Sequence, residues 1–304
     1  NTIARLCHGK ADDLLSTVIL ATNASILVAP SMNQQMFASK AIKENLKILK
    51  NRGVVTINPG FGQQACGDVG EGRLAEPLEI AQQVANIFSN NTLSGKKVLI
   101  TIGGTIEAID PVRYISNHSS GKMGMALAHA CIQAGAETSI IVGSISVEVE
   151  KRAKITYVSS ADEMYEAVMK KINTQDLFIS CAAVADFKPT KISLNKIKKD
   201  SNLASIELTK NKDILESVCQ LKDKPICIGF AAETENFLTN AIAKLNKKKC
   251  DAIILNDISS SEIGLNSDYN EVHFISKEKT EKIDISSKQI IAEKIIKKVS
   301  KYFF

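Results

Sequence analysis

The amino-acid sequence predicts an α/β protein with two domains, the second of which is built on a doubly wound, mainly parallel sheet. Short apolar runs, typical of buried strands, alternate along the chain with segments of helical periodicity. Several of these runs end in glycine or polar residues, as the run at 97–102 does at Gly103-Gly104-Thr105. Ligand-binding loops take this position in doubly wound sheets. A chain of 304 residues has room for about two domains.

The composition is that of an ordinary globular protein, with 44% hydrophobic and 23% charged residues. We expect no membrane span, because no apolar run reaches about 18 residues. A formal charge of +5, five tyrosines and no tryptophan argue against a nucleic-acid partner. Seven scattered cysteines without a C-x-x-C pair argue against a zinc site or a disulfide framework and indicate a reducing, cytoplasmic location.

In the first part of the chain, the spacing of Ile3, Leu6, Ala11 and Leu14 predicts one helix over 2–20. The elements expected after it are a strand at 24–29, a polar loop at 31–37, a helix at 41–52, a strand at 53–57, a glycine-rich loop at 59–77 and a helix at 78–88. A compact sheet domain of this kind should begin before residue 1. The polar stretch 89–95 marks the boundary between domains 1–93 and 94–304.

The second domain opens with the strand at 97–102. Further strands are predicted at 138–142, 155–158, 177–181, 205–208, 226–230, 252–255 and 273–275, and helices at 125–131, 161–172, 214–221, 236–248 and 288–302. Residues 188–202 read as an irregular basic stretch. The alternation of strands and helices predicts a parallel sheet with ligands at the carboxyl ends of its strands.

One stretch of this domain, 113–124, combines hydroxyl groups, Asn117 and glycines between a strand and a helix. Such a loop offers N–H and hydroxyl donors beside a helix N-terminus, which suits an anion. An ordinary surface loop is the alternative explanation.

Other strand ends add polar groups to the same edge of the predicted sheet. Asp186 follows four small residues, 182–185, and the segment 211–214 begins a helix. Helix capping is the alternative role of both, and core packing is the alternative for Phe230. Basic groups lie nearby in sequence: Lys196, Lys198 and Lys199, and then Lys244, Lys247, Lys248 and Lys249. A solvated face would also explain the lysines, but two such groups beside an anion loop suit a nucleoside triphosphate.

A nicotinamide cofactor is disfavoured, because the loop after strand 97–102 lacks the G-x-G-x-x-G spacing. In the first domain, Cys66 lies in a glycine-bounded loop, where a thiol can act as a nucleophile or proton donor. Asn33 is placed either to contact a ligand or to form a turn. The four histidines show no metal-binding spacing.

Taken together, these stretches resemble one family: the bifunctional flavoproteins of coenzyme A synthesis, which join phosphopantothenoylcysteine decarboxylase to phosphopantothenate–cysteine ligase. The resemblance rests on the order and spacing of the motifs at 1–4, 11–17, 30–37, 65–68, 72–77, 110–124, 182–186, 196–199, 229–234 and 256–257. It implies a Rossmann-like ligase domain, preceded by the C-terminal part of a flavodoxin-like decarboxylase domain.

For the ligase, the resemblance implies that CTP activates 4′-phosphopantothenate and that cysteine attacks the acyl-cytidylate. It implies that Lys196 acts in the activation step and that Asn117 assists the conversion of the acyl-cytidylate. Arg113 would bind the anionic groups of the substrate. The CTP site would be lined by Ser180, Cys181, Ala182, Asp186, Lys196, Asn211, Lys212, Asp213, Ile214, Phe230, Lys244 and Lys248. Mg²⁺ is the expected metal, with ligands that the sequence does not identify.

For the decarboxylase, the resemblance implies the cofactor FMN, substrate binding by Asn33 and proton donation by Cys66. The chain begins within the family's flavin motif, so we expect that it does not decarboxylate alone. The family's ligase domains pair as dimers and its decarboxylase domains as trimers, which predicts a homo-oligomer.

The sequence departs from the family pattern at Ile106, Ala108 and Lys212, and Ile106 removes a possible phosphate contact. The alternative to an enzyme is a non-catalytic binding or regulatory subunit that retains the fold. Lys196 and Asn117 argue against it, because a binding module needs neither.

Overall fold

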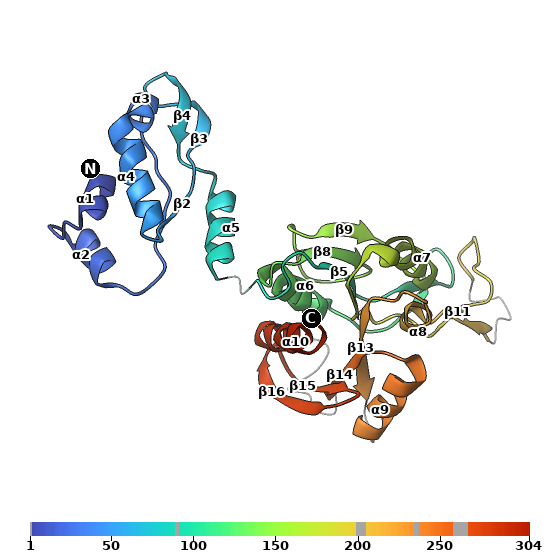
Figure 1. Cartoon of the computed structure of the whole chain (residues 1–304). Coiled ribbons are helices and arrows are strands. Elements are labelled where there is room, and N and C mark those ends of the chain that lie inside the picture. The colour runs from blue at the N-terminus through green and yellow to red at the C-terminus, as the bar shows by residue number, and fades with distance from the viewer. Residues whose placement is uncertain (1, 89–90, 199–204, 234–236, 258–266) are drawn as a thin grey trace. The chain divides into compact units, whose positions relative to one another are not determined.

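The computed structural model describes residues 2–88, 91–198, 205–233, 237–257 and 267–304. The chain forms two compact units, Asn1–Ser89 and Asn90–Phe304, which are considered separately below (Figure 1). Among the described residues, no helix is long and apolar enough to cross a membrane.

The first unit joins helices to two small pairs of strands. Its elements are α1 (Thr2–His8), α2 (Leu14–Ala21), β1 (Leu27–Val28), α3 (Gln34–Ala38), α4 (Lys40–Asn51), β2 (Val55–Thr56), β3 (Gly60–Gln63), β4 (Val69–Arg73) and α5 (Pro77–Ile87). Strands β1 and β2 pair in parallel, whereas β3 and β4 form an antiparallel hairpin. The hairpin lies in the stretch 59–77, for which we predicted a loop; glycine-rich strands lack the apolar alternation that predicts them.

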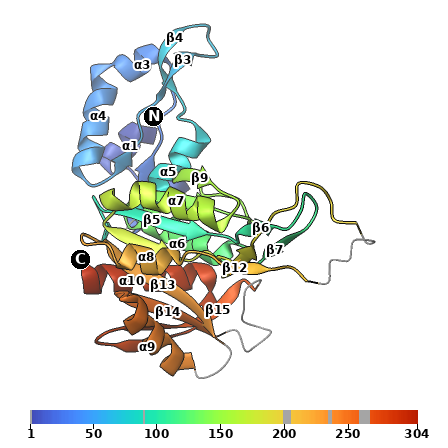
Figure 2. The ribbon, with the colours of Figure 1, turned by 90° about the vertical axis from the view of Figure 1, so that its right-hand side faces the viewer.

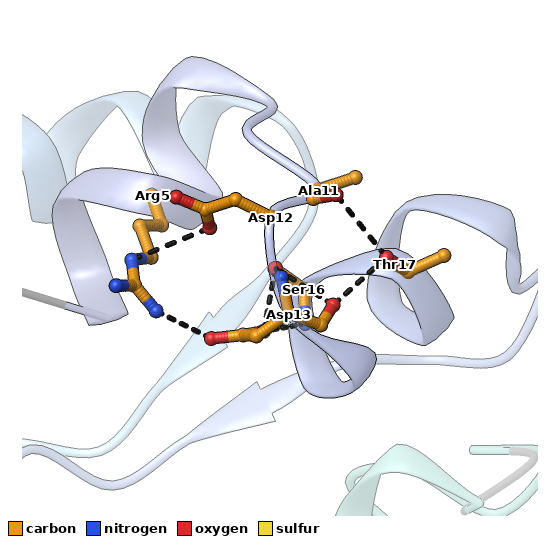
Figure 3. A network of polar contacts seen from close by, with 6 residues as sticks. All are labelled: Arg5, Ala11, Asp12, Asp13, Ser16 and Thr17. Carbon is orange, nitrogen blue, oxygen red and sulfur yellow. Dashed lines mark hydrogen bonds and ion pairs between the residues drawn. The ribbon is translucent and has the colours of Figure 1, made fainter.

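The prediction of a single opening helix was wrong. Helix α1 ends at His8, Gly9 follows with a φ of 65°, and α2 begins only at Leu14. The Asp13 side chain caps α2 by accepting a hydrogen bond from the Ser16 backbone N–H at 2.7 Å, and it also pairs with Arg5 (Figure 3). The capping interaction begins a new helix where the apolar spacing alone continues the old one.

The second unit contains an eight-stranded sheet in the order β16-β15-β14-β13-β10-β5-β8-β9. Its strands are β5 (Lys97–Ile102), β8 (Glu137–Val142), β9 (Lys154–Tyr157), β10 (Leu177–Ser180), β13 (Ile226–Glu233), β14 (Ala252–Asp257), β15 (Tyr269–Ser276) and β16 (Thr280–Ser287). The six strands from β14 to β9 are parallel, and β15 and β16 are antiparallel to their neighbours. This is the doubly wound fold that the sequence predicts.

Helices cover both faces of this sheet (Figures 1 and 2). One buried cluster joins the sheet to α6 (Lys122–Gln133) and α10 (Lys288–Phe303), through residues such as Leu127 and Ile295. The other cluster joins it to α7 (Ala161–Lys171), α8 (Ile214–Cys219) and α9 (Phe237–Lys248), through residues such as Val168 and Leu245. A short helix, η1 (Ile172–Thr174), follows α7. These layers hold the carboxyl ends of the parallel strands at one edge.

Two small antiparallel pairs project from this domain and form what we call the arm. They are β6 (Ile106–Ala108) with β7 (Tyr114–Ser116), and β11 (Phe187–Pro189) with β12 (Leu208–Lys210) (Figure 2). The arm also includes the connecting stretches 109–113 and 190–198. We predicted a strand at 205–208, but the observed strand begins at Leu208. Residues 199–204 and 236, which fell in predicted elements, lie outside the described residues.

Candidate active site

A cavity of about 990 Å³ lies at the carboxyl ends of β5, β10, β13 and β14. The strand order reverses between β5 and β10, so the cavity occupies the switch point where doubly wound folds bind their ligands. Seven lysines and three acidic residues are among the described residues that line it. Such an excess of ammonium groups favours a ligand with several negative charges.

The loop at 117–124 forms one wall of this cavity, as the sequence predicted. It leads into α6, whose N-cap, Gly121, has a φ of 78° and makes no capping hydrogen bond through a side chain. A Cβ at Gly121 would lie 2.5 Å from the Ile145 side chain, and one at Gly124 would lie 2.7 Å from Ile102. Glycine at these two positions lets α6 begin close to β5 with its N–H groups at the cavity.

A second wall is the segment that follows β10, where Ser180, Cys181, Ala182 and Asp186 line the cavity. Its backbone is held by neighbouring strands and loops: the Ala183 N–H donates to the Gly103 carbonyl at 2.8 Å, and the Ala185 N–H donates to the Thr105 hydroxyl at 3.0 Å. Burial raises the pKa of the Cys181 thiol to about 12. Cys181 is therefore neutral at pH 7 and serves as wall rather than as nucleophile.

Asn117, which the resemblance places at the acyl-cytidylate, lines the same cavity. Its side-chain amide donates to the Val184 carbonyl at 3.0 Å and so joins the two walls. The amide is thus oriented between the anion loop and the segment after β10.

The third wall combines the start of α8 with one face of α9. Asn211, Lys212, Asp213, Ile214, Phe230, Lys244 and Lys248 all line the cavity, as predicted. The Asp213 carboxylate caps α8 through the Glu216 N–H at 2.9 Å and pairs with the Lys248 ammonium at 2.6 Å. The Lys212 ammonium lies 4.6 Å from the centre of the Tyr165 ring. Asp213 therefore caps α8 while it lines the cavity, so the capping role does not exclude a role in ligand binding.

In this wall, the side chain of Asn211 has one amide atom with a hydrogen-bond partner and one without. Its amide nitrogen donates to the Ala185 carbonyl at 2.8 Å, whereas its buried Oδ1 has no partner among the described residues. The buried Oδ1 of Asn256, which also lines the cavity, has none either. Buried acceptors without donors are costly, so the two atoms mark places where a water molecule or a ligand supplies the donor.

Two residues that the resemblance places at the site, Lys196 and Arg113, are not among the described residues that line the cavity, and their roles stay predictions. Lys196 is exposed on the arm, and the Arg113 guanidinium is engaged with the Asp110 carboxylate and donates to the Ile197 carbonyl at 2.8 Å. Arg113 therefore holds the stretch that carries Lys196. Ile106 and Ala108 are not part of the described lining either, and the expected loss of a phosphate contact at Ile106 stays a prediction.

Asp110 and Arg113 together hold the backbone at Ile197, and we call this group the clamp. Asp110 lies at its centre. Its side chain is fully buried and accepts hydrogen bonds from the backbone N–H groups of Val112 and Arg113, both at 2.8 Å, and of Ile197 at 3.1 Å. The hydrogen bonds from the Arg113 guanidinium hold the pKa of Asp110 well below its usual range. Sequence reasoning missed this role, because an Asp-Pro pair also signals a simple turn.

Two further lining residues, Asn270 and Lys288, were not predicted, whereas His118 and Lys122 belong to the predicted loop but were given no role of their own. Lys288 begins α10 directly after the edge strand β16. Nothing in the local sequence indicates that such a lysine is buried at a site. Asn256 belongs to a motif of the resemblance, which was the available signal.

In the first unit, the structure brings Asn33 and Cys66 together. The Asn33 amide nitrogen lies 3.3 Å from the Cys66 sulfur and 3.2 Å from an Asp68 carboxylate oxygen, and its Oδ1 accepts from the Gln35 N–H at 2.8 Å. The hairpin β3–β4 presents the turn that carries Cys66, which is exposed. An amide N–H held at an accessible thiol is suited to positioning a proton donor.

The fold and the cavity of the second unit define a class: doubly wound α/β proteins that bind a polyanionic ligand of nucleotide type at the topological switch point.

Comparison with known proteins gives the family. Residues 93–303 match the model described as DNA/pantothenate metabolism flavoprotein C-terminal domain, and residues 1–89 match the model described as Flavoprotein. The coenzyme A biosynthesis bifunctional protein CoaBC of Vibrio cholerae is 45% identical over 97% of this chain and 74% of its own length. The Escherichia coli CoaBC protein is 40% identical over 98% of the chain and 74% of its own length.

Solved structures agree. The C-terminal domain of a CoaBC protein shares 35% identity with this chain at a TM-score of 0.60, covering 70% of this chain and 97% of that one. The DNA/pantothenate metabolism flavoprotein from Streptococcus pneumoniae, at 24% identity and a TM-score of 0.59, shares the fold. The chain therefore belongs to the bifunctional CoaBC family of coenzyme A biosynthesis, the family that its motifs resemble, and is an enzyme that joins a decarboxylase domain to a ligase domain.

Proposed function

We propose that the second unit ligates cysteine to 4′-phosphopantothenate with CTP as the activating nucleotide. The observation that carries this proposal is the lysine-rich cavity at the switch point, whose walls hold all the predicted nucleotide residues except Lys196. A carboxylate oxygen of phosphopantothenate attacks the α-phosphorus, the bond between the α- and β-phosphates breaks, and pyrophosphate leaves. The cysteine amine then attacks the acyl carbon, loses a proton and displaces CMP.

The residues of the cavity suit the first of these steps because they supply positive charge on two sides. Lys244 and Lys248 belong to α9, and the N–H groups at the start of α6 face the same space from the other wall. Fixed donors and ammonium groups stabilise negative charge as it develops during phosphoryl transfer. Holding both substrates in one cavity contributes through orientation as well.

Asn211 is suited to bind the base of the nucleotide. The Asn211 Oδ1 is a buried acceptor that lacks a donor among the described residues, and an exocyclic amino group supplies one. Cytosine and adenine both carry such a group, whereas uracil does not. This argument supports CTP or ATP over UTP, and the resemblance selects CTP.

Mg²⁺ is the metal expected with a nucleoside triphosphate. The described residues contain no cluster of three or more acidic, histidine or cysteine side chains that could hold a metal by themselves. Mg²⁺ bound to a nucleotide needs only one or two carboxylates in addition to the phosphates, and the exposed carboxylate of Asp186 in the cavity fits that need. When bound, the ion neutralises phosphate charge.

Lys196 keeps its proposed role at the activation step. The clamp formed by Asp110 and Arg113 fixes the backbone beside it, at Ile197. A lysine on an arm that is anchored in this way can be directed at a bound substrate without lining the cavity itself.

For the first unit we propose a part in phosphopantothenoylcysteine decarboxylation with FMN as the cofactor, a reaction that we expect this chain not to carry out alone. The Flavoprotein match supports it, and Asn33 follows β1 of the parallel pair β1–β2, on the side of the carboxyl ends of the strands, where α/β sheets bind their ligands. FMN would supply the redox chemistry. Asn33 would hold the substrate, and the exposed Cys66 thiol would donate a proton.

The experiment for the ligase measures pyrophosphate release by the purified chain with 4′-phosphopantothenate and Mg²⁺, with CTP, ATP or UTP, with and without cysteine. We expect release with CTP that requires phosphopantothenate and is lost in Lys196→Ala. No release from folded protein with any nucleotide would overturn the proposal and favour a binding or regulatory role.

We also propose that two copies pair through the arm, whose apolar side chains are exposed; Leu194 is 90% exposed and Ile192 is 61% exposed. A patch of this kind usually marks an interaction site. A trimer of the first unit stays a prediction of the resemblance. A cytoplasmic location is supported by the seven cysteines, all of which are free thiols.

A further inference from the structure

Three cysteines of the second unit lie together in the buried cluster that joins the sheet to α7, α8 and α9, outside the described cavity lining. Cys219 is the last residue of α8, Cys227 belongs to β13, and Cys250 lies between α9 and β14. Cys219 is 4% exposed and the other two are fully buried. The sulfurs of Cys219 and Cys250 lie 3.8 Å apart, which is contact between two free thiols.

The surroundings of the three thiols distinguish them. The Cys227 thiol donates to the Pro225 carbonyl at 3.2 Å. Hydrogen bonding with Cys227, and then with Cys250, lowers the pKa of Cys219, and the same contacts raise the pKa of both partners. The thiolate is the form that attacks an oxidant, so Cys219 is the thiol that reacts first. Cys250 is then placed to react second.

A metal site is the alternative use of three neighbouring thiols. Among the described residues, however, no group of three or more His, Cys, Asp or Glu side chains is arranged to hold a metal ion. Two thiols in contact suit oxidation to a disulfide instead. Cys219 is followed directly by a turn in which Gln220, Lys222 and Asp223 are exposed, and the end of a short helix beside such a turn opens locally more easily than the core.

Both cysteines belong to segments that also carry the proposed nucleotide wall. Helix α8 begins after Asp213 and α9 ends at Lys248, and these two side chains line the cavity and pair at 2.6 Å. Cys219 is at the other end of α8, and only Lys249 separates Cys250 from α9. A disulfide needs about 2.0 Å between its sulfurs, so forming it draws α8 toward the end of α9 and disturbs the wall at Asp213.

We propose that Cys219 and Cys250 are an oxidation site, at which a peroxide converts the two thiols into a disulfide that weakens nucleotide binding until a thiol reductant reopens it. The effect on the nucleotide rests on the proposed function of the second unit.

The Cys219 thiolate attacks one peroxide oxygen, the O–O bond breaks, and the leaving hydroxide takes up a proton and becomes water. The Cys250 sulfur then attacks the sulfur of the resulting sulfenic acid, the S–O bond breaks, and the second hydroxide leaves as water with the Cys250 proton. Two thiols are oxidised to one disulfide, and the peroxide is reduced to two molecules of water.

The test treats the folded chain with hydrogen peroxide and maps its linked peptides by mass spectrometry without reduction. We expect a link between Cys219 and Cys250 that dithiothreitol reverses and that is absent in Cys219→Ala and Cys250→Ala. Mapping separates this link from oxidation of the exposed Cys66. Cys131→Ala, at a fully buried thiol of α6, is the matched control and should form the link as the unaltered chain does.

No link in the folded chain, or a link from Cys219 to Cys227 instead, would overturn the assignment. A link that forms no faster than Cys131 is oxidised would also overturn it, because the pair would then be reached only by global unfolding. These outcomes are read from the unaltered chain, so they stand even if an alanine variant does not fold.

Calorimetry with CTP and Mg²⁺ measures the effect on the nucleotide. We expect the oxidised chain to bind CTP roughly 5-fold or more weakly than the reduced chain, and Cys219→Ala to bind equally before and after peroxide. Equal affinity of the oxidised and reduced chains would overturn the effect on binding. A reduced chain that binds no CTP but forms the link has the oxidation site without the proposed function, whereas a chain that binds CTP but forms no link has the nucleotide site alone.

Discussion

At the scale of single residues, Asp110 shows how a buried carboxylate can matter to a site that it does not line. Its two oxygens accept three backbone N–H groups and the Arg113 guanidinium, and one of those N–H groups belongs to Ile197. Charge-assisted hydrogen bonds of this kind are strong and directional. The place of Lys196 is therefore set by residues more than 80 positions earlier in the chain.

We predict that Asp110→Asn lowers kcat for pyrophosphate release roughly 10- to 100-fold, because a catalytic group moved by about 1 Å loses that much. The amide removes the charge that holds Arg113, so the stretch at Ile197 is released. KM for CTP should change little, since Asp110 is outside the cavity lining. Steady-state kinetics measures both constants.

Asp223→Asn, at an exposed aspartate, is the control for this substitution. An unchanged kcat in Asp110→Asn, with the thermal unfolding temperature also unchanged, would show that the clamp does not position Lys196. A rise in KM alone would place Asp110 among the nucleotide contacts.

At the scale of elements, the start of α6 depends on a backbone conformation that L-residues rarely adopt. We predict that Gly121→Ala lowers the free energy of unfolding by about 1–3 kcal/mol, because the methyl group adds a clash with Ile145 to the left-handed strain. Urea unfolding followed by circular dichroism measures the change.

Gly95→Ala is the matched control for Gly121→Ala. Gly95 has nearly the same φ, 76°, but a Cβ there meets no atom within 4 Å. Gly95→Ala should therefore lower the free energy of unfolding only by the strain of the left-handed backbone conformation, about 1 kcal/mol. If both variants lost the same free energy of unfolding, the close packing of Gly121 against Ile145 would not contribute to stability.

The surface of α6 carries an ion-pair group that makes stability depend on pH. Glu150 accepts hydrogen bonds from Arg152 at 2.8 and 2.9 Å and contacts the His129 ring at 2.9 Å. Hydrogen bonding from Arg152 is the main cause that lowers the pKa of Glu150 to about 2 from 4.5. A carboxyl with a lowered pKa stabilises the fold above its unfolded value, and the contribution is lost as the pH falls from about 4.5 toward 2.

We therefore predict that Glu150→Gln is less stable than the unaltered chain at pH 7, and that the difference narrows below about pH 4.5. Urea midpoints measured from pH 7 to pH 3 give the comparison. Glu148→Gln, at an exposed neighbour, should follow the unaltered chain at every pH. A difference for Glu150→Gln that stays constant with pH would exclude the ionised carboxylate as its source.

The elements that could be predicted from the sequence are those whose own residues carry the pattern of a buried strand or an amphipathic helix. Buried parallel strands such as β5 and β10 are apolar throughout, and amphipathic helices such as α4 repeat apolar residues at helical spacing. The hairpins β3–β4 and β6–β7 and the edge strand β16 were missed, because they are short, glycine-bearing or exposed. Their pairing depends on partners that a local pattern does not show.

The same limit applies to the site. Residues at strand ends, such as Asp186 and Phe230, were predictable because a doubly wound sheet brings those ends together. Lys288 was not, since its burial follows from how α10 packs against α6, a helix far earlier in the chain. Lys196 and Arg113 were assigned by resemblance, which transfers roles but not positions.

At the scale of the whole molecule, the arm is the feature on which the proposed pairing of two copies rests. We predict that Leu194→Asp reduces the mass of the particle in solution from two copies toward one, because a charge in a buried apolar contact is costly. Light scattering over a range of concentrations measures the mass. Ile290→Asp, at a partly exposed apolar residue on α10, should leave it unchanged. A mass that is the same for Leu194→Asp and the unaltered chain would rule out the arm as the contact.

The position of Lys288 also bears on the order in which the protein becomes competent during synthesis. Every other described part of the cavity wall, from Gly103 to Asn270, is translated before α10. Domains fold largely as units once their chain has emerged from the ribosome. A nascent chain that has completed the parallel strands still lacks the ammonium group and the helix that close the α6 side of the cavity. The cavity is therefore incomplete until α10 has emerged, and a chain that ends at residue 287 would contain every strand of the sheet and still have an incomplete pocket.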